Sequence, residues 1–248
     1  FARRKGDRYV VNGRKVWTST AQVANKILLL TRTTSFAESK RPSHGMTLFY
    51  TDLDRTRVEV RMIEKCGRNA VDSNALFIDG LEIPETDRIG EEGRGFHYLL
   101  AGLNAERIIV AAGILGATRY VMDKAVAYAR DRVVFGRPIG QNQAVQHPLA
   151  ELWVHQQAAE LLLMKSAALY DSGAECGAEV NGAKYFCADL FYRAASRAVR
   201  THGGFGYAKE FHVERYFRES ILPLVAPVSQ ELALSYVAER ALGLPKSY

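Results

Sequence analysis

The first third of the chain alternates short runs of β-branched and aromatic residues with turn-forming residues. The first run, residues 9–11, is followed by Asn12-Gly13, a pair that favours a two-residue hairpin turn, and then by a second run at residues 15–20. Similar runs predict strands at residues 26–32, 46–51, 58–62 and 75–78, and the polar stretch 35–44 predicts a loop.

From about Gly93 the spacing of apolar residues changes to the helical period. It predicts helices that reach from there to Asp131, from 142 to 172 and from 178 to 202, with two shorter helices nearer the end. The segment 84–93 between the two patterns is rich in Glu, Gly and Pro. We therefore expect an α+β protein with a small β domain over residues 1–90 and a helical bundle over residues 91–248.

Composition limits the classes of protein to which the chain belongs. Its 248 residues are 48% apolar and 24% charged, which is typical of a globular protein, and no run of about 18 apolar residues predicts a membrane span. The net charge of +6 comes from basic residues spread among acidic ones, so no dense patch favours a nucleic-acid partner. Three cysteines without CxxC spacing indicate a reducing compartment, and six histidines without ligand spacing indicate no metal site. The start at Phe1 leads us to expect that upstream sequence is missing.

One acidic residue, Glu106, falls on the apolar stripe of the first long helix. The stripe consists of Leu99, Leu103, Val110, Ile114, Ala117, Val121 and Ala125. A carboxylate at that helical spacing must be desolvated, paired or functional. Burial without a partner raises the pKa of a carboxyl group to a range that suits a general base. The alternative is a structural acid that a nearby Arg or backbone N–H groups satisfy.

The turn at residues 132–143 joins the first two long helices and carries candidate ligand-binding groups. It combines the cations Arg132 and Arg137, the aromatic Phe135 and amide side chains, and helix N–H groups begin near Asn142. Such a turn can hold a phosphate diester and an aromatic heterocycle. The alternative is a connecting turn whose phenylalanine only packs.

Two further segments carry features that suit a ligand. The turn 201–207 contains three glycines, which would let a ligand approach the backbone closely, although a helix C-cap would explain two of them. Trp17-Thr18-Ser19 offers a flat indole and hydroxyl donors at a strand, which suit a flavin ring, whereas a core tryptophan is the alternative.

Together and in this order, these segments resemble the acyl-CoA dehydrogenase family, over essentially the whole chain. Residues 11–19 (VNGxKxWxS) are similar to the family's strand pair under the flavin ring, residues 132–136 (RxxFG) with Gln143 to the turn that reaches a neighbouring subunit's FAD, and residues 203–207 (GGxGY) to the turn near the adenosine end of the cofactor. The resemblance implies a small β-sandwich or barrel-like domain followed by an up-down four-helix bundle with short terminal helices. It implies FAD contacts from Trp17, Ser19, Arg132, Phe135, Gln143, Arg200, Gly203, Gly204 and Ser229, and substrate contacts from Leu103, Asn104 and Arg107.

Two departures from the family pattern matter. The helical domain and the flavin-binding strand and loop with which relatives begin are not in these residues, so we expect either a portion of a longer polypeptide or a short subunit that a partner completes. The position of the usual catalytic glutamate falls on Pro227, which also lacks the backbone N–H that relatives use on the thioester carbonyl. Either Ala226 or Val228 presents its N–H instead, or dehydrogenation is slow. Arg200 stands where relatives often have Gln.

A minority of the family carries its base on the first long bundle helix in an LxxER context, which Glu106-Arg107 matches. The resemblance then implies an FAD-dependent acyl-CoA dehydrogenase in which Glu106 removes the α-proton while hydride leaves the β-carbon, giving a trans-2-enoyl-CoA. It implies as partners an acyl-CoA, an electron-transferring flavoprotein or similar acceptor, and further subunits in a homodimer, homotetramer or heteromer. The implied location is the bacterial cytoplasm or the mitochondrial or peroxisomal matrix. Two alternatives are a non-catalytic subunit that completes a partner's site, and a flavin monooxygenase or oxidase in which Glu106 is structural.

Overall fold

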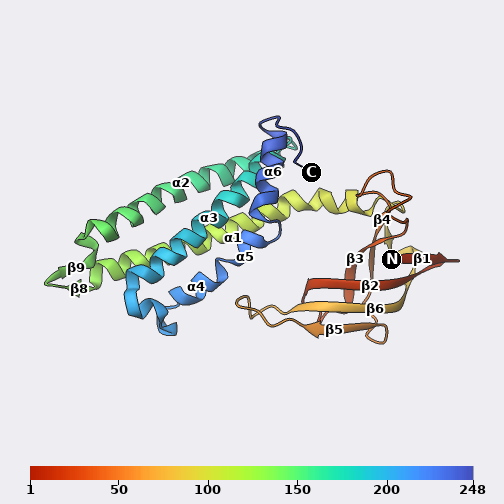
Figure 1. Cartoon of the computed structure of the whole chain (residues 1–248), viewed down its shortest axis with the longest axis horizontal. Coiled ribbons are helices and arrows are strands. Elements are labelled where there is room, and N and C mark those ends of the chain that lie inside the picture. The colour runs from red at the N-terminus through yellow and green to blue at the C-terminus, as the bar shows by residue number, and fades with distance from the viewer. Residues whose placement is uncertain (248) are drawn as a thin grey trace. The chain divides into compact units, whose positions relative to one another are not determined.

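The computed structural model describes residues 1–247, except for the side chain of residue 101. Its strands come first and its long helices follow, which confirms the α+β class predicted from the sequence (Figure 1). The chain divides into two compact units, Phe1–Leu103 and Asn104–Tyr248. The first long helix crosses this division, and the boundary at residue 90 that the sequence indicates stays a prediction.

The first unit contains two antiparallel sheets. One has the strand order β1-β2-β6-β5 and the other β3-β4-β7. The strands are β1 Ala2–Lys5, β2 Arg8–Ser19, β3 Lys26–Arg32, β4 Met46–Asp52, β5 Val58–Met62, β6 Ser73–Pro84 and β7 Arg88–Ile89, with a short 3₁₀ turn at Glu85–Asp87. Side chains from both sheets meet in one apolar core, where the ring of Tyr9 lies edge-on to Phe49 at 4.9 Å. Along β3 and β6 buried and exposed or half-buried residues alternate, because successive side chains point to this core and away from it.

The hairpin expected at Asn12-Gly13 is wrong. Strand β2 continues through both residues, and its pairing with β6 shifts register between Val11 and Gly13. Gly13 has φ 153°, which favours glycine, and the Asn12 side chain accepts a hydrogen bond from the Gly80 N–H at 2.9 Å. The Asn-Gly pair forms a bulge here because β2 pairs with the distant strand β6 rather than with the residues that follow the pair.

The second unit is a helical bundle with short connecting elements (Figure 1). Its long helices are α1 Gly95–Asp131, α2 Gln143–Asp171 and α3 Gly177–His202, and its shorter ones are α4 Val213–Glu219, α5 Leu222–Val225 and α6 Gln230–Arg240. The small hairpin of β8 Val133–Val134 and β9 Arg137–Pro138 joins α1 to α2, and 3₁₀ turns lie at Ile139–Gln141, Gly203–Tyr207 and Lys209–Phe211. The three long helices begin and end within a few residues of the bounds predicted from the sequence. The described residues contain no fourth helix of comparable length, and the short α6 packs against α3.

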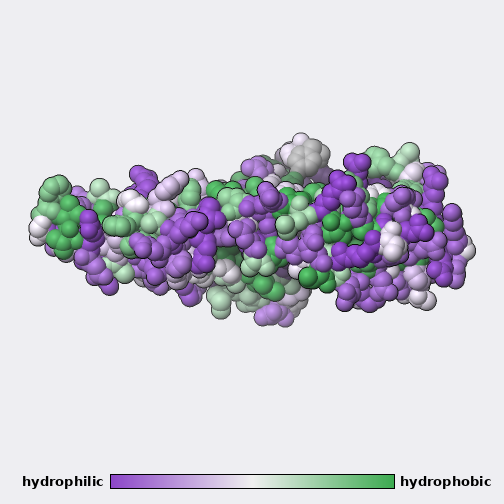
Figure 2. Space-filling view, turned by 90° about the horizontal axis from the view of Figure 1, so that it is seen from below, coloured by the Kyte–Doolittle hydropathy of each residue, from purple (hydrophilic) through white to green (hydrophobic). Residues whose placement is uncertain are grey.

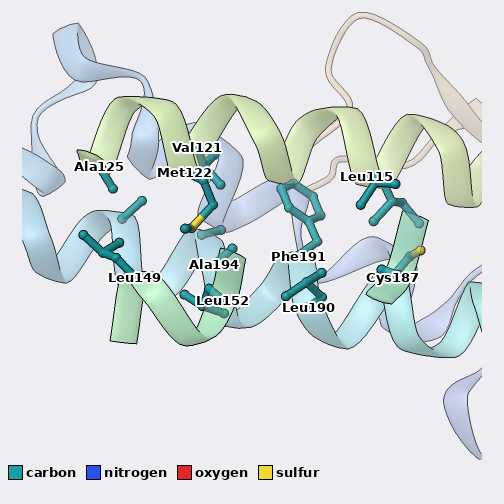
Figure 3. Close-up of a cluster of buried hydrophobic side chains, with 14 of the residues drawn as sticks. Leu115, Val121, Met122, Ala125, Leu149, Leu152, Cys187, Leu190, Phe191 and Ala194 are labelled. Carbon is teal, nitrogen blue, oxygen red and sulfur yellow. The ribbon is translucent and has the colours of Figure 1, made fainter. Parts of the chain in front are cut away.

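The bundle core is formed by apolar side chains from all three long helices, as Figure 3 shows. The labelled residues are Leu115, Val121, Met122 and Ala125 of α1, Leu149 and Leu152 of α2, and Cys187, Leu190, Phe191 and Ala194 of α3. Burying a leucine- or phenylalanine-sized side chain stabilises a fold by about 1.5–3 kcal/mol. Alanines at the closest positions of α3 let the helices approach one another.

Helix α1 is apolar over much of its length. By length and composition alone it would be able to cross a membrane, since one window has a mean hydropathy of 1.5, so the expectation that no segment qualifies was too strict. The core helix of a soluble protein meets the same criterion. Val121 and Ala125 of α1 are fully buried in the bundle core.

Candidate active site

Glu106 is exposed on α1, contrary to the expectation of a desolvated carboxylate. Five residues separate it from Ala111, which is fully buried, and at 3.6 residues per turn the two side chains point about 140° apart. The predicted apolar stripe is confirmed at Ile114, Val121 and Ala125, which are buried in the bundle core, but not at Glu106. In the part of the chain that the structure describes, Glu106 makes no hydrogen bond or ion pair, but its charge acts on the neighbouring Arg107 guanidinium, so the alternative of a structural acid stays open.

The desolvated ionisable group on this turn of α1 is Arg107. It lies four residues before Ala111 and faces the bundle, and its Nε is buried without a hydrogen-bond partner in the described residues. Its Nη1 donates to the Asn104 Oδ1 at 3.4 Å, and the Asn104 amide lies 3.8 Å from the Cys176 Sγ. Burial lowers the pKa of Arg107, and the neighbouring Glu106 and Tyr236 oppose this shift.

Lys184 on α3, which was not among the residues predicted for the site, is fully buried near Arg107. Its Nζ donates to the Val228 carbonyl at 2.5 Å and to the Gln230 Oε1 at 3.2 Å. Burial, and to a smaller extent the Arg107 guanidinium, lower the pKa of Lys184 to about 8, and Glu231 opposes the shift. The only sequence signal was a lysine in the otherwise apolar and small-residue face of α3.

The connection between α5 and α6, residues 226–229, is therefore held against α3. The Ala226–Pro227 peptide is cis, and the Ala226 N–H donates to the Leu222 carbonyl at 2.9 Å, so Ala226 does not present a free N–H in place of Pro227. Of the two residues that the sequence suggested as N–H donors in place of Pro227, only Val228 remains. Ser229 is the N-cap of α6, because its Oγ accepts from the Leu232 N–H at 3.3 Å. The Ser229 hydroxyl and backbone N–H groups lower the pKa of Glu231.

The turn between α1 and α2 presents an aromatic ring to solvent. Phe135 lies at the tip of the β8–β9 hairpin, with a side chain 101% exposed and φ 53°, a conformation that disfavours a bulky residue. Figure 2 shows hydrophobic side chains at the end of the helical unit where Figure 1 labels β8 and β9. Arg132 and Gln143 are also exposed. Phe135 therefore does not pack within the chain, and the alternative of a merely packing phenylalanine is wrong for the described residues.

The glycines of the 203–207 turn have different roles. Gly203 is the C-cap of α3, with φ 60°, and a Cβ on Gly206 would overlap the backbone carbonyl of Val199. At Gly204 a Cβ would meet nothing within 4 Å, and its φ does not require glycine. A C-cap thus explains one glycine, packing explains another, and Gly204 alone is left for close approach by a ligand. Arg200, in the last turn of α3, is exposed.

In the first unit, Trp17 lies at an irregular point of strand β2, where its side chain is exposed. The pairing of β2 with β6 shifts between Lys15 and Thr18, and Trp17 has φ 63° and is 62% exposed, so it is not a core tryptophan within its unit. Asn74, fully buried, donates from its amide to the Thr18 carbonyl at 3.0 Å and fixes this end of the strand. Ser19, the last residue of β2, is exposed. Asn74 is a supporting residue that the sequence pattern did not single out.

The candidate residues of the helical unit lie at its two ends. At one end, Leu103, Asn104, Glu106 and Arg107 of α1 lie with Lys184 and the connection to Ser229. At the other end, the ring of Tyr128 stacks on His202 at 4.3 Å, which brings the Arg132–Gln143 turn and the glycine turn together. Glu106 and Arg130 are 24 residues apart on α1, which is roughly 36 Å at 1.5 Å per residue. A single chain therefore does not bring its two groups of candidates together.

A groove of about 550 Å³ lies along α1 and α2. It is lined by Met122, Trp153 and Gln156 among others, and the Gln156 Oε1 is buried without a hydrogen-bond partner in the described residues. Its first lining residue on α1, Arg119, lies 13 residues from Glu106, or roughly 20 Å. The groove therefore contains none of the candidate residues.

Comparison with known proteins gives the same family along both units. Residues 1–81 match the model of the acyl-CoA dehydrogenase middle domain, and residues 93–242 match that of the acyl-CoA dehydrogenase C-terminal domain. The acyl-CoA dehydrogenase FadE12 of Mycobacterium bovis is 35% identical over 249 residues, which cover 100% of this chain and 63% of the relative. The short/branched chain specific acyl-CoA dehydrogenase of Bos taurus is 30% identical, over 96% of this chain and 54% of that protein.

Solved structures agree with the sequence matches. The crystal structure of an acyl-CoA dehydrogenase from Geobacillus kaustophilus superposes with a TM-score of 0.92 at 28% identity, covering 98% of this chain and 63% of that one. The chain thus spans less than two thirds of the length of these relatives. Because the two family models cover most of the chain in the expected order, the protein belongs to the acyl-CoA dehydrogenase family.

Proposed function

We propose that this chain supplies the middle and C-terminal domains of an FAD-dependent acyl-CoA dehydrogenase that converts an acyl-CoA thioester to a trans-2-enoyl-CoA, with Glu106 as the α-proton base. The observation that carries the proposal is the arrangement around Lys184. Lys184 bonds to the connection that follows Pro227, and it lies near enough to Arg107, on the turn of α1 that bears Glu106, for the Arg107 charge to lower its pKa. The two positions at which the family carries its base thus belong to one end of the bundle, and only one of them holds a carboxylate.

Glu106 has the properties that a base at this place needs. Its carboxylate is unpaired in the described residues and close enough to Arg107 to raise the pKa of that guanidinium. A bound acyl chain would cover it and remove water, which strengthens a carboxylate as a base. Leu103, Asn104 and Arg107 lie within one turn of it on α1, and we propose them as its substrate contacts.

Members of the family are FAD flavoproteins, and the exposed groups of this chain fit that cofactor. Trp17 and Phe135 hold their rings in solvent from left-handed backbone positions, an arrangement that costs free energy and is typical of binding sites. Gly204 leaves its backbone open to close approach. When bound, FAD supplies the hydride acceptor for the β-carbon.

We further propose that copies of the chain share their cofactor sites. Within one chain, roughly 36 Å of α1 separates Glu106 from the end that carries Arg132, Phe135 and Gln143. Those three exposed side chains, with Arg200, Gly203 and Gly204, would then complete the site of a second subunit. Electrons would leave to an electron-transferring flavoprotein or similar acceptor.

Anaerobic reduction of the flavin tests the base. In the full-length protein, Glu106→Gln should retain FAD and slow its reduction by an acyl-CoA panel by about 10²- to 10⁴-fold, the usual contribution of a positioned base. Asp123→Asn is the matched control, because Asp123 is an exposed carboxylate on the same helix. Flavin bleaching at the unmodified rate in Glu106→Gln would show that Glu106 is not the base.

A second candidate function is a non-catalytic subunit that completes a partner's site. It is favoured by Pro227 and by the Ala226 N–H, which is bonded to the Leu222 carbonyl, since neither supplies the donor that relatives use. Turnover by a purified homo-oligomer would count against it. Co-purification with a related chain that carries its own glutamate, together with an inactive homo-oligomer, would favour it.

A further inference from the structure

The ammonium of Lys184 is buried in the bundle although the proposed proton transfer does not use it. Its side chain is fully buried, and its charged form is disfavoured by burial and by the Arg107 guanidinium. Burying a charge that no opposite charge pairs with costs free energy. A buried ammonium kept at this place therefore calls for a role beyond packing.

What Lys184 holds is the backbone after Pro227. Its Nζ donates to the Val228 carbonyl at 2.5 Å and to the Gln230 Oε1 at 3.2 Å. The Gln230 amide nitrogen donates in turn to the Tyr185 carbonyl at 3.1 Å, so both ends of that amide are fixed by α3. The first turn of α6 is thereby tied to α3 on both sides of Ser229.

This contact determines where the next backbone N–H points. The Val228–Ser229 peptide is trans, and in a trans peptide the C=O and the N–H point in opposite directions. With the Val228 carbonyl turned to Lys184, the Ser229 N–H points away from it. Neither the Val228 N–H nor the Ser229 N–H has an acceptor in the described part of the chain, whereas the Ala226 N–H is bonded and Pro227 has none.

We propose that Lys184 is a positioning residue that turns the Val228–Ser229 peptide so that the Ser229 N–H, helped by that of Val228, donates to the thioester carbonyl oxygen in place of the donor that Pro227 lacks. This inference rests on the proposed function. A charge-assisted hydrogen bond to the carbonyl end of a peptide polarises it and strengthens the donor at the other end. The ammonium thus stabilises enolate charge without touching the substrate.

The test uses the full-length protein and Lys184→Met, which keeps the length of the side chain and removes its charge and donors. Asn181→Ala is the control for disturbed packing, since Asn181 is buried one turn earlier on α3 and bonds only within its helix, to the Gly177 carbonyl at 2.7 Å. The probe is the 3-thia analogue of the acyl-CoA that binds most tightly, isotope-labelled at its thioester carbonyl. Infrared difference spectroscopy then measures the carbonyl stretching frequency, which falls when a donor polarises the bond, without any need for turnover.

We expect the bound carbonyl frequency to lie below that of the free probe in the unmodified protein and in Asn181→Ala, and to return toward the free value in Lys184→Met. Flavin reduction in Lys184→Met should slow by about 10- to 100-fold at saturating substrate with little change in KM, because removing one oxyanion donor outright costs about 10²- to 10³-fold. An unchanged frequency and rate in Lys184→Met would overturn the role of Lys184 while the dehydrogenase assignment stands. A lowered frequency that depends on Lys184 in a protein that no acyl-CoA reduces would refute the dehydrogenase and support the positioning role. Absence of probe binding would refute both.

Discussion

The burial of Lys184 also has a consequence for stability that is measurable without substrate. An amine whose pKa is about 8 in the folded chain, against an ordinary value of 10.5, is harder to protonate folded than unfolded. Below about pH 8 both states carry the proton, and the folded state bears the full cost of the buried charge. As pH rises from about 8 to about 10.5, the folded state loses the proton first and that cost disappears, so the free energy of unfolding rises.

The size of the effect follows from the separation of the two pKa values. A difference of roughly 2.5 units at about 1.36 kcal/mol per unit gives about 3 kcal/mol in total, of which about 2.5 kcal/mol falls between pH 7 and pH 10. The charged groups that face Lys184 are Arg107 from α1 and Glu231 from α6. The pKa of Glu231 is itself lowered, so that carboxylate stays charged over this range, and burial lowers the pKa of Arg107.

Urea unfolding, followed by far-ultraviolet circular dichroism at a series of pH values, checks this in the unmodified chain and in Lys184→Met. Subtracting the two curves removes groups common to both, including Cys187, whose pKa burial raises to about 12. In Lys184→Met the Val228 carbonyl and the Gln230 side chain lose their donor, which lowers the stability of the variant by an amount that does not depend on pH. The change with pH of the difference in unfolding free energy is therefore the quantity that tests the buried ammonium. The difference, unmodified minus variant, should grow by about 2.5 kcal/mol between pH 7 and pH 10. A flat difference would refute the desolvated ammonium.

Two further predictions concern the ends of the bundle. Gly206→Ala should lower the free energy of unfolding by about 1–3 kcal/mol in urea melts, because its Cβ would overlap the Val199 carbonyl. Gly204→Ala, where the space is open, should change the free energy of unfolding by less than about 0.5 kcal/mol. Equal effects would contradict the different roles assigned to the two glycines. Phe135→Ala should leave the stability of the single chain within about 0.5 kcal/mol, because the ring is fully exposed, but should lower the FAD content of the purified protein, measured from its visible absorbance; full FAD retention would count against Phe135 as a cofactor contact.

Several features of this protein are local and were therefore readable from the sequence. The helical period continues for 37 residues in α1 and 26 in α3, long enough to predict their bounds closely. The strand at Lys26–Arg32 was likewise predicted at its observed bounds, from a run of apolar residues flanked by polar ones. The spaced motifs identified the family, and the acid at Glu106 was visible because so few charged residues interrupt that part of α1.

Other features depended on contacts between segments far apart in the chain. Asn12-Gly13 became a bulge because β6, more than sixty residues later, is the partner of β2. Glu106 is exposed and Arg107 half-buried because one residue turns a helix by about 100°, a rotation that only the packing of α1 against its neighbours determines. Lys184 bonds to the connection that leads into α6, at Val228, 44 residues further along the chain, and no local pattern predicts that contact. The sequence by itself thus determined the elements, the family and the candidate base. The tertiary structure decided which side chains lose water and which backbone groups remain free, because burial is a property of neighbouring elements and not of the local pattern.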